Sequence, residues 1–461
     1  MITVMLNDKI DQPLYEQLYM HIRSMIENGS LKAGEKLPSK RTFSSHLQVS
    51  QVTVENAYNQ LKAEGYINAI EKKGYYVQEI EFIPKVKPKA EYEVKCEIKS
   101  SSDIKFNLKT NTVDTSNFPF SVWTRLMREC LNNEADSLLK PVHPQGDIEL
   151  RNSIAEYLRE FRNMNVSAEQ IVLGAGSEYL LGLITEMLPN HVFAVEDPGY
   201  YKTSRILQSR KMKMHLISMD NEGMCIDELK NTSANVVHIT PSHHFPLGTI
   251  MSINRRRQLL QWASQKDERY IIEDDYDSEY RFVLKPIPTL QSLDHNNKVI
   301  YMNTFAKTLA PSLRIGYMVL PKRLLLHYRE QLMFYSCTVS EFEQRTLRAF
   351  IRGGYYERHL NRMKKIYKNR RDAFLQGLMP LNHIISISGE DAGMHLLLKV
   401  NNGMNEAELV ESARNKGVGV SGLSNYYINK IPDTKTVVVG YASFTPFELK
   451  KIASLLVEAW K

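Results

Sequence analysis

A single lysine, Lys307, follows an apolar stretch (Val299–Asn303) that is typical of a buried strand, within the segment NTFAKTLAPSLRIG. Thr304 lies three residues before this lysine, and Arg314 lies seven residues after it. A lysine amine can form a covalent bond with a carbonyl compound, and a hydroxyl together with a guanidinium can hold a phosphate beside it. The spacing therefore predicts covalent chemistry on a small molecule that carries both a carbonyl and an anionic group.

Carboxylate and phenol groups end an earlier apolar stretch. We expect a strand over Tyr270–Glu273, and it continues into Asp274, Asp275 and Tyr276. Because successive side chains of a strand point to opposite faces, Asp274 and Tyr276 are expected on one side of the chain and Asp275 on the other. A site that uses the Asp274 carboxylate therefore has a phenol available beside it.

Backbone amides and an aromatic ring complete the set. Gly176 and Ser177 open a helix that we expect to reach Leu188, and free amides at a helix start bind phosphate. Tyr200, in the sequence EDPGYY, can stack on a planar ring. Amine, carboxylate, phenol, cation and amides are together what pyridoxal 5′-phosphate requires: a Schiff-base partner, a partner for the pyridinium nitrogen, a donor to the ring oxygen and a phosphate site. Each feature alone is common, since a lone lysine is usually a solvated surface residue, but the whole set in this order favours that cofactor.

The elements that must position these residues alternate between strand-like and helix-like segments from Phe106 onward, as in IVLGAGSEYLLGLI and HVFAVEDPGY. This alternation predicts an α/β domain with a mostly parallel sheet, whose ligands bind at the carboxyl ends of the strands. There is no G-x-G-x-x-G after a first strand, so nothing indicates a dinucleotide-binding fold. We expect this domain over residues 105–461, with a smaller C-terminal subdomain from about residue 325, and an extended linker over residues 81–104 before it.

The first eighty residues have a different pattern, that of a small helical domain with two short strands. An amphipathic helix is expected from Pro13 to Asn28, a second helix capped by Ser39, and a third capped by Ser50. On the third helix, polar side chains face outward: Gln51, Thr53, Glu55, Asn56 and Asn59. Two helices joined by a tight turn suit insertion into a major groove. Periodicity alone favours a small dimerisation domain with a solvated polar face, because most such faces are solvated.

Charge and composition exclude several other classes. The net charge is +7, yet residues 1–80 hold nine Lys/Arg and nine Asp/Glu, so charge alone does not identify a DNA-binding domain. The four cysteines form no C-x-x-C pair, which argues against a disulfide framework or a zinc site. No apolar run approaches the roughly 20 residues that span a bilayer, and no leader peptide is evident. We expect a cytoplasmic protein without a metal site.

The run LPSKR…VSQVTVENAYNQLKAEGY…KKGYYV resembles the winged helix-turn-helix domain of the GntR family of bacterial transcription regulators, over about residues 12–80. The resemblance implies binding to double-stranded DNA. It implies that these residues meet the backbone, the bases or the minor groove: Ser39, Arg41, Ser50, Gln51, Thr53, Lys73 and Gly74. The family usually has arginine where this chain has Gln51, and glutamine prefers adenine where arginine prefers guanine, so we expect an altered operator.

From about residue 106 to the end, the chain resembles fold type I aminotransferases, and the fused order is similar to the MocR subgroup of GntR regulators. The resemblance implies a regulator, not an enzyme, and a homodimer in which the DNA-binding domain of one subunit can cross over the other. It implies that Lys307 carries pyridoxal 5′-phosphate, that Asp274 and Tyr276 orient it, and that its phosphate is bound by Thr304, Arg314, Gly176 and Ser177.

Two departures from the aminotransferase pattern concern the ligand. Phe245 stands where related enzymes have an asparagine, and His243 just before it either approaches the cofactor or is a structural histidine. Val438, in TVVVGYASF, stands where related enzymes have the arginine that binds a substrate carboxylate. Other cations could serve in its place: Lys202, Arg205 and Arg210.

The valine favours sensing of the cofactor itself, as in the PdxR-like regulators of vitamin B6 synthesis, over the GABA-responsive kind. Three alternatives stay open at this point: a sensor of an amino acid or amine together with the cofactor, a true aminotransferase, and a DNA-binding scaffold that has lost its cofactor.

Overall fold

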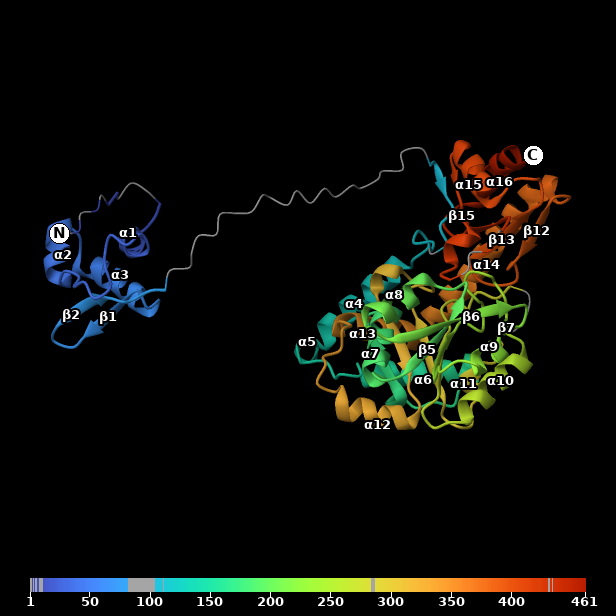
Figure 1. The fold of residues 1–461 in the computed structure, drawn as a ribbon, viewed down its shortest axis with the longest axis horizontal. Coiled ribbons are helices and arrows are strands. Elements are labelled where there is room, and N and C mark those ends of the chain that lie inside the picture. Colours follow the sequence, from blue (N-terminus) through green and yellow to red (C-terminus); the bar gives the residue numbers. More distant parts are fainter. Residues whose placement is uncertain are drawn as a thin grey trace. The chain divides into compact units, whose positions relative to one another are not determined.

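The computed structural model describes residues 2, 4, 6–7, 11–81, 104–110, 112–282, 287–429, 432 and 434–461. The chain forms two compact units, residues 1–99 and 100–461, and each is described by itself (Figure 1). The linker expected over residues 81–104 lies outside the described residues except for its two end positions.

The first unit contains three helices and a two-stranded antiparallel sheet: α1 (Leu14–Glu27), α2 (Lys40–Leu47), α3 (Gln51–Ala63), β1 (Ile67–Ile70) and β2 (Gly74–Val77). Ser39 and Ser50 cap α2 and α3 as expected, because their side chains accept hydrogen bonds from the amides of Thr42 and Thr53. The apolar stripe of α3 packs on α1, with Leu18, Ile22, Val54, Tyr58 and Leu61 all buried in one core. A winged helix-turn-helix is thus built on its own hydrophobic core.

The second unit is organised around an eight-stranded sheet in the order β4-β11-β10-β9-β8-β5-β6-β7. Strands β10, β9, β8, β5 and β6 pair in parallel, whereas β11 and β7 are antiparallel to their neighbours. The strands are β4 (Ile171–Gly174), β5 (Val192–Asp197), β6 (Lys213–Asp220), β7 (Gly223–Met224), β8 (Val236–Ile239), β9 (Tyr270–Asp274), β10 (Val299–Thr304) and β11 (Gly316–Val319).

Helices cover both faces of this sheet because its strands are apolar on both faces. Along β9, Tyr270 and Ile272 belong to one core and Ile271 to the other. One face is covered by α7 (Ser177–Met187), α8 (Tyr201–Ser209) and α12 (Lys322–Gln331). The other face is covered by α4 (Phe120–Asn133), α6 (Ile148–Arg162), α9 (Ile226–Lys230), α10 (Ile253–Ser264), α11 (Leu290–Leu293) and α13 (Glu341–Arg352), with α5 (Ala135–Leu138) following α4.

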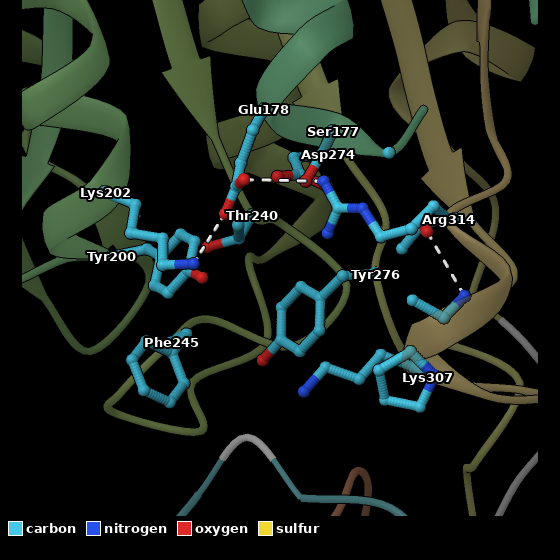
Figure 2. A pocket seen from close by; sticks show the side chains of 14 residues that line it. Ser177, Glu178, Tyr200, Lys202, Thr240, Phe245, Asp274, Tyr276, Lys307 and Arg314 are labelled. Atoms are coloured by element: carbon cyan, nitrogen blue, oxygen red, sulfur yellow. Dashed lines mark hydrogen bonds and ion pairs between the residues drawn. The ribbon is translucent and has the colours of Figure 1, made fainter. Parts of the chain in front are cut away.

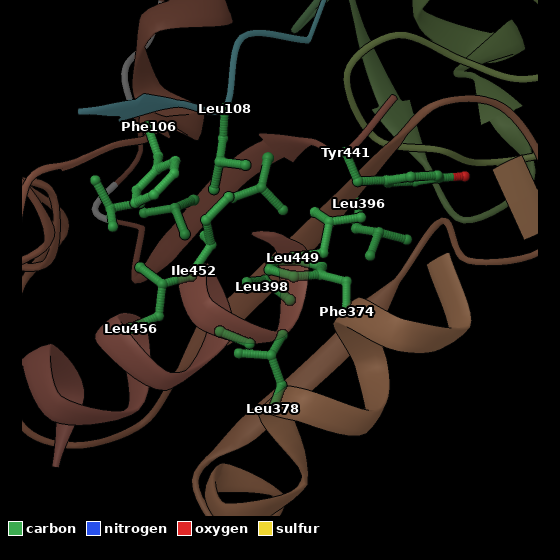
Figure 3. Packing of buried hydrophobic residues seen from close by; sticks show 14 of the residues in the cluster. Phe106, Leu108, Phe374, Leu378, Leu396, Leu398, Tyr441, Leu449, Ile452 and Leu456 are labelled. Carbon is green, nitrogen blue, oxygen red and sulfur yellow. The ribbon is translucent and has the colours of Figure 1, made fainter. Parts of the chain in front are cut away.

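A smaller subdomain is built on a second, antiparallel sheet in the order β12-β13-β16-β15. Its elements are α14 (Tyr355–Leu378), β12 (Ile385–Ser388), β13 (His395–Val400), α15 (Glu406–Asn415), β14 (Val418–Gly419), β15 (Ser421–Gly422), β16 (Thr436–Gly440) and α16 (Pro446–Trp460). Phe374 and Leu378 of α14 pack with Leu449, Ile452 and Leu456 of α16 (Figure 3).

The subdomain boundary expected at about residue 325 is too early. Helices α12 and α13 pack against the large sheet and its helices, so the small subdomain begins only within α14. The small subdomain also takes in the start of the unit, since β3 (Phe106–Asn107) pairs in parallel with β14, and Phe106 and Leu108 enter its core (Figure 3).

Within the described residues, no helix has both the length and the apolar character needed to cross a bilayer.

Candidate functional site

A cavity of about 210 Å³ lies at the carboxyl ends of the parallel strands, where an α/β sheet is expected to bind ligands. Eight of the nine residues predicted to bind the cofactor line it (Figure 2): Gly176, Ser177, Tyr200, Asp274, Tyr276, Thr304, Lys307 and Arg314. They come from the turn between β4 and α7, the start of α7, the residue before α8, the end of β9 and the residues after it, and the end of β10 and the segment after it. Sequence positions from 176 to 314 are thus brought together by the sheet.

The amine of Lys307 is adapted to react at neutral pH. Burial of the side chain lowers the pKa of Lys307 to about 8; Lys202 also lowers it, and the Asp277 carboxylate raises it. A lysine with an ordinary pKa near 10.4 is almost wholly protonated at neutral pH and cannot attack a carbonyl. Lowering the pKa therefore makes a useful fraction of the amine neutral.

Asp274 offers an acceptor that the protein itself does not use. Its Oδ2 lies 3.7 Å from Nε2 of His238, while its Oδ1 is buried and accepts no hydrogen bond from any described residue. A buried acceptor without a partner is costly, so a donor brought by a ligand would stabilise it. The protonated nitrogen of a pyridine ring is such a donor, and this carboxylate therefore fits pyridoxal 5′-phosphate.

Side chains at the end of β9 and just after it alternate between the two sides of the chain, as predicted. Asp274 and Tyr276 both line the cavity, whereas Asp275 points the other way and pairs with Arg162 at 2.5 Å and with the hydroxyl of Tyr301 at 2.7 Å. The pKa of Tyr276 is raised well above its ordinary value, mainly by burial and then by Asp277, so the phenol keeps its proton. It can then donate a hydrogen bond to a ring oxygen.

The other end of the cavity suits an anion. Gly176 has φ +88°, and a Cβ there would lie 3.1 Å from Nη2 of Arg314, so a side chain would displace the guanidinium. That Nη2 donates to the carbonyl oxygen of Ala175 at 2.9 Å. Ser177 and Thr304 also face the cavity. A guanidinium, hydroxyls and the amino end of α7 form a place for a phosphate.

Glu178 is a charged residue in this cavity that the sequence did not single out. Its carboxylate lies 2.5 Å from Nζ of Lys202 and 3.4 Å from Nη2 of Arg314 (Figure 2). It directly follows Ser177 in the chain, which was the only available signal. Thr240, Ala306 and Pro311 complete the lining, together with Phe245.

His243 does not line the cavity. It lies behind Tyr276, with Nδ1 3.3 Å from the phenol oxygen and 2.9 Å from Oδ2 of Asp277. Its Nε2 is buried and has no hydrogen-bond partner among the described residues. The histidine therefore touches the residue that was expected to meet the cofactor, not the cavity itself.

Apolar residues surround Val438, which was expected from sequence to stand in place of the arginine of related enzymes, and Val438 is not among the residues that line the cavity. Val438 is fully buried in a cluster with Leu397 and Leu423, against which Leu247 and Tyr426 pack. The alternative cations lie elsewhere: Arg205 is exposed and outside the cavity lining, and Arg210 pairs with Glu186 at 2.5 Å. Lys202 does reach the cavity, paired with Glu178.

The predicted DNA-contacting residues lie at the starts of α2 and α3 and at the turn between β1 and β2. Ser39, Arg41, Ser50, Gln51 and Lys73 are exposed, while Thr53 is half-buried at the start of α3. Gly74 has φ +112°, a value that glycine adopts readily, where the wing turns into β2.

Comparison with known proteins agrees with both halves of the chain. Residues 14–77 match the family of bacterial regulatory proteins of the gntR type, and residues 103–456 match aminotransferase class I and II. The probable rhizopine catabolism regulatory protein MocR of Rhizobium meliloti is 31% identical over 97% of this chain and 94% of its own. The chain belongs to the MocR subgroup of the GntR family.

Two further transcription regulators are similar to this chain over nearly its full length. The HTH-type pyridoxine biosynthesis transcriptional regulator PdxR of Corynebacterium glutamicum is 30% identical over 96% of the chain and 95% of its own. An uncharacterized HTH-type regulator of Bacillus subtilis, YdeL, is 41% identical over 100% and 99%.

The multiple substrate aminotransferase from Thermococcus profundus superposes on the second unit with a TM-score of 0.68 and 25% identity, over 78% of this chain and 91% of the enzyme. The expected fold, a winged helix-turn-helix followed by a fold type I aminotransferase-like domain, is confirmed. The MocR-type chain is a transcription regulator in the first place, and its second domain is of the class that binds pyridoxal 5′-phosphate.

Proposed function

We propose that this MocR-type regulator senses pyridoxal 5′-phosphate itself and controls genes of vitamin B6 synthesis. The observation that carries this proposal is Val438, which is buried in an apolar cluster and which the resemblance to aminotransferases matches to the arginine that binds an amino-acid carboxylate. A carboxylate buried against valine and leucine side chains would have no partner, which costs several kcal/mol. The cofactor alone needs no such clamp.

The cations that line the cavity also favour the cofactor over an amino acid as the sensed ligand. Among the described lining residues these are Lys307, Arg314 and Lys202. In the proposal Lys307 holds the cofactor covalently and Arg314 binds its phosphate, while Lys202 already pairs with Glu178. No cation is then left for an amino-acid carboxylate.

Each lining residue has a definite task toward the cofactor, which supplies a reactive aldehyde and an electron-withdrawing ring when bound. Asp274 accepts from the ring nitrogen, and Tyr276 donates to the ring oxygen. Four lining residues bind the phosphate, and Tyr200 packs on the ring; the four are Gly176, Ser177, Thr304 and Arg314. His243 positions Tyr276 through the contact with its hydroxyl.

For the DNA-binding domain we propose that α3 enters the major groove of an operator. Gln51 and Thr53 would read bases there, Ser39, Arg41 and Ser50 would fix the docking of α2 and α3, and Lys73 and Gly74 of the wing would reach the minor groove. A homodimer, in which the DNA-binding domain of one subunit can cross over the other, would present two such helices to two half-sites. Binding of the cofactor would shift the population between two arrangements of that dimer.

A sensor of an amine or amino acid is the second candidate, and Lys202 is the observation that favours it, because this cation reaches the cavity. The names of the relatives point both ways, since one regulates rhizopine catabolism and another pyridoxine biosynthesis at nearly equal identity. A true aminotransferase would need the carboxylate clamp that Val438 replaces, and the lost-cofactor scaffold conflicts with a complete set of lining residues.

The test is a titration of the cofactor-free protein with pyridoxal 5′-phosphate while its binding to its own upstream DNA is followed. We expect the cofactor alone to change DNA affinity or footprint, with Lys307→Ala unresponsive. If the cofactor alone has no effect and an added amino acid or amine does, the amine sensor replaces this proposal. Steady consumption of an amino acid and a keto acid would identify an aminotransferase instead.

A further inference from the structure

One carboxylate lies between the two cations at the phosphate end of the cavity. Glu178 is 2.5 Å from Nζ of Lys202 and 3.4 Å from Nη2 of Arg314 (Figure 2). The side chains of all three residues are partly exposed, between 37% and 52%, so they are accessible to a ligand that enters the cavity. The cavity therefore carries an anion of its own beside the guanidinium that a phosphate would use.

Glu178 lies at the end of its helix where a phosphate would also bind. Ser177 and Glu178 are the first two residues of α7, whose amino end favours a negative charge. The cofactor phosphate would be attracted by the same helix end and the same Arg314. A phosphate monoester carries between about one and a half and two negative charges at neutral pH, so a carboxylate beside it opposes its binding.

The carboxylate stays ionised without a ligand. The pKa of Glu178 is lowered, first by the hydrogen bond from Lys202 and also by the charges of Lys202 and Arg314, against the opposing effect of burial. Because Lys202 comes from α8, it can keep its contact with Glu178 when Arg314 turns to another anion. Lys202 thus partly neutralises the carboxylate that a phosphate would meet.

We propose that Glu178 is a built-in counter-anion that competes with the cofactor phosphate for Arg314, and that Lys202 limits this competition by pairing with Glu178. Glu178 lowers the affinity for the phosphate, and Lys202 moderates this loss. Together the two residues determine the concentration of pyridoxal 5′-phosphate at which the protein binds it. This inference rests on the proposed function in one respect, that the sensed ligand is the cofactor. A sensor needs such reversible loading, whereas an enzyme gains from permanent occupation.

The first experiment compares two ligands that differ only in the phosphate. Glu178→Gln keeps the size and the hydrogen-bonding oxygen of the side chain but removes its charge. We expect the dissociation constant for pyridoxal 5′-phosphate, followed by its visible absorbance without DNA, to fall about tenfold, and that for pyridoxal to stay within about twofold. Glu186→Gln, on the same helix but paired with Arg210 outside the cavity lining, is the matched control and should change neither.

Unchanged or weaker binding of the phosphorylated ligand to the Glu178→Gln protein would overturn the inference. So would an equal gain for both ligands, because the effect would then act on Lys307 or on the fold instead of the phosphate. A melting temperature recorded for each variant separates folding from binding.

The second experiment examines the coupling between the two residues. The measured quantity is the ratio of the dissociation constants for pyridoxal and its phosphate, which isolates the contribution of the phosphate group. Lys202→Met should weaken binding of the phosphorylated ligand and so reduce this ratio about fivefold when Glu178 is present. The reduction should be much smaller in the Glu178→Gln background. Equal reductions in both backgrounds would show that Lys202 binds the phosphate by itself and would overturn the coupling.

A failure of the proposed sensing function can be distinguished experimentally from a failure of the inference on Glu178. If DNA binding never responds to pyridoxal 5′-phosphate, the proposed sensor is wrong, yet the affinities measured without DNA still decide the role of Glu178. If both proposals hold, Glu178→Gln lowers the cofactor concentration at half-maximal DNA response by the same factor as the dissociation constant.

Discussion

At the scale of single residues, burial in the cavity shifts the pKa values of the two groups that would react with or donate to a ligand, Lys307 and Tyr276. Burial lowers the pKa of Lys307 to about 8, while burial and nearby carboxylates raise the pKa of Tyr276. The two pKa shifts are opposite in sign, but each favours the neutral form of its group. The amine of Lys307 becomes reactive, and the phenol of Tyr276 keeps the proton that it donates. Both states suit a ligand with an aldehyde next to a ring oxygen.

The shift of Lys307 predicts the pH dependence of cofactor attachment. A lowered pKa means that the neutral amine is present above about pH 8 and is lost as the pH falls through this value. At about pH 7.4, roughly a fifth of the amine is neutral, against about one part in a thousand for an ordinary lysine. The initial rate of attachment, trapped with borohydride and located by mass spectrometry, should therefore rise with pH and reach half of its plateau near 8.

A small lysine derivative in the same buffer is the control for the ionisation of the cofactor, and its rate should keep rising toward about pH 10.4. Lys307→Ala should show no attachment at this position at any pH. A profile of the protein that follows the free lysine would mean that the cavity does not perturb the amine.

The sequence predicted most of this site and missed the part that depends on distant contacts. The strand period alone separates Asp274 and Tyr276 from Asp275, and the structure agrees. Glu178 was not foreseen, because its importance comes from Lys202, which lies 24 positions away on another helix. The place of His243 behind a tyrosine likewise depends on how the loops after β8 and β9 pack, which no periodicity encodes.

At the scale of elements, local signals determined helix starts well and subdomain limits poorly. Ser39 and Ser50 cap α2 and α3 as expected, since a capping hydrogen bond involves only neighbouring residues. The small subdomain was expected about thirty residues too early, and its recruitment of β3 was not foreseen. Both errors concern pairings between parts of the chain that lie far apart in sequence.

The amino end of α3 predicts the base preference of the operator. Gln51 is exposed at the first position of this helix, where side chains meet base edges. A glutamine suits adenine and an arginine suits guanine, with discrimination of about 1–3 kcal/mol for a good bidentate contact. Gln51→Arg should therefore change the preferred base at one position of each half-site, as measured by selection from a randomised operator library.

Asn59→Arg provides the matched control, because it adds the same charge to an exposed position nearer the end of the same helix. It should raise affinity for all sequences slightly and leave the preference unchanged. An unaltered preference in the Gln51→Arg protein would show that this residue does not read bases.

At the scale of the whole molecule, the proposed function requires that cofactor binding in one unit affects DNA binding by the other, although each unit has its own core. The first core is built from residues of α1, α3 and the wing, and the second unit holds the cavity with all of its lining residues. Among the described residues, the members of the first core all belong to the first unit and the lining of the cavity all belongs to the second. In the proposed homodimer, a coupling between the cofactor and DNA would act by changing which arrangements of the two DNA-binding domains are populated.

This separation predicts how the protein behaves when it is divided. A fragment of residues 104–461 should bind pyridoxal 5′-phosphate within about twofold of the full chain, and a fragment of residues 1–81 should fold but bind operator DNA at least about a hundredfold more weakly, without any response to the cofactor. The loss is expected because two half-sites bound through one dimer gain a high effective concentration that a single domain lacks. Sedimentation should find the larger fragment dimeric and the smaller one monomeric, and a chain of residues 1–81 joined to an unrelated dimer should recover affinity without recovering the response. A small fragment that binds as tightly as the full chain would instead mean that the second unit regulates access to the DNA-binding surface, not the pairing of two such surfaces.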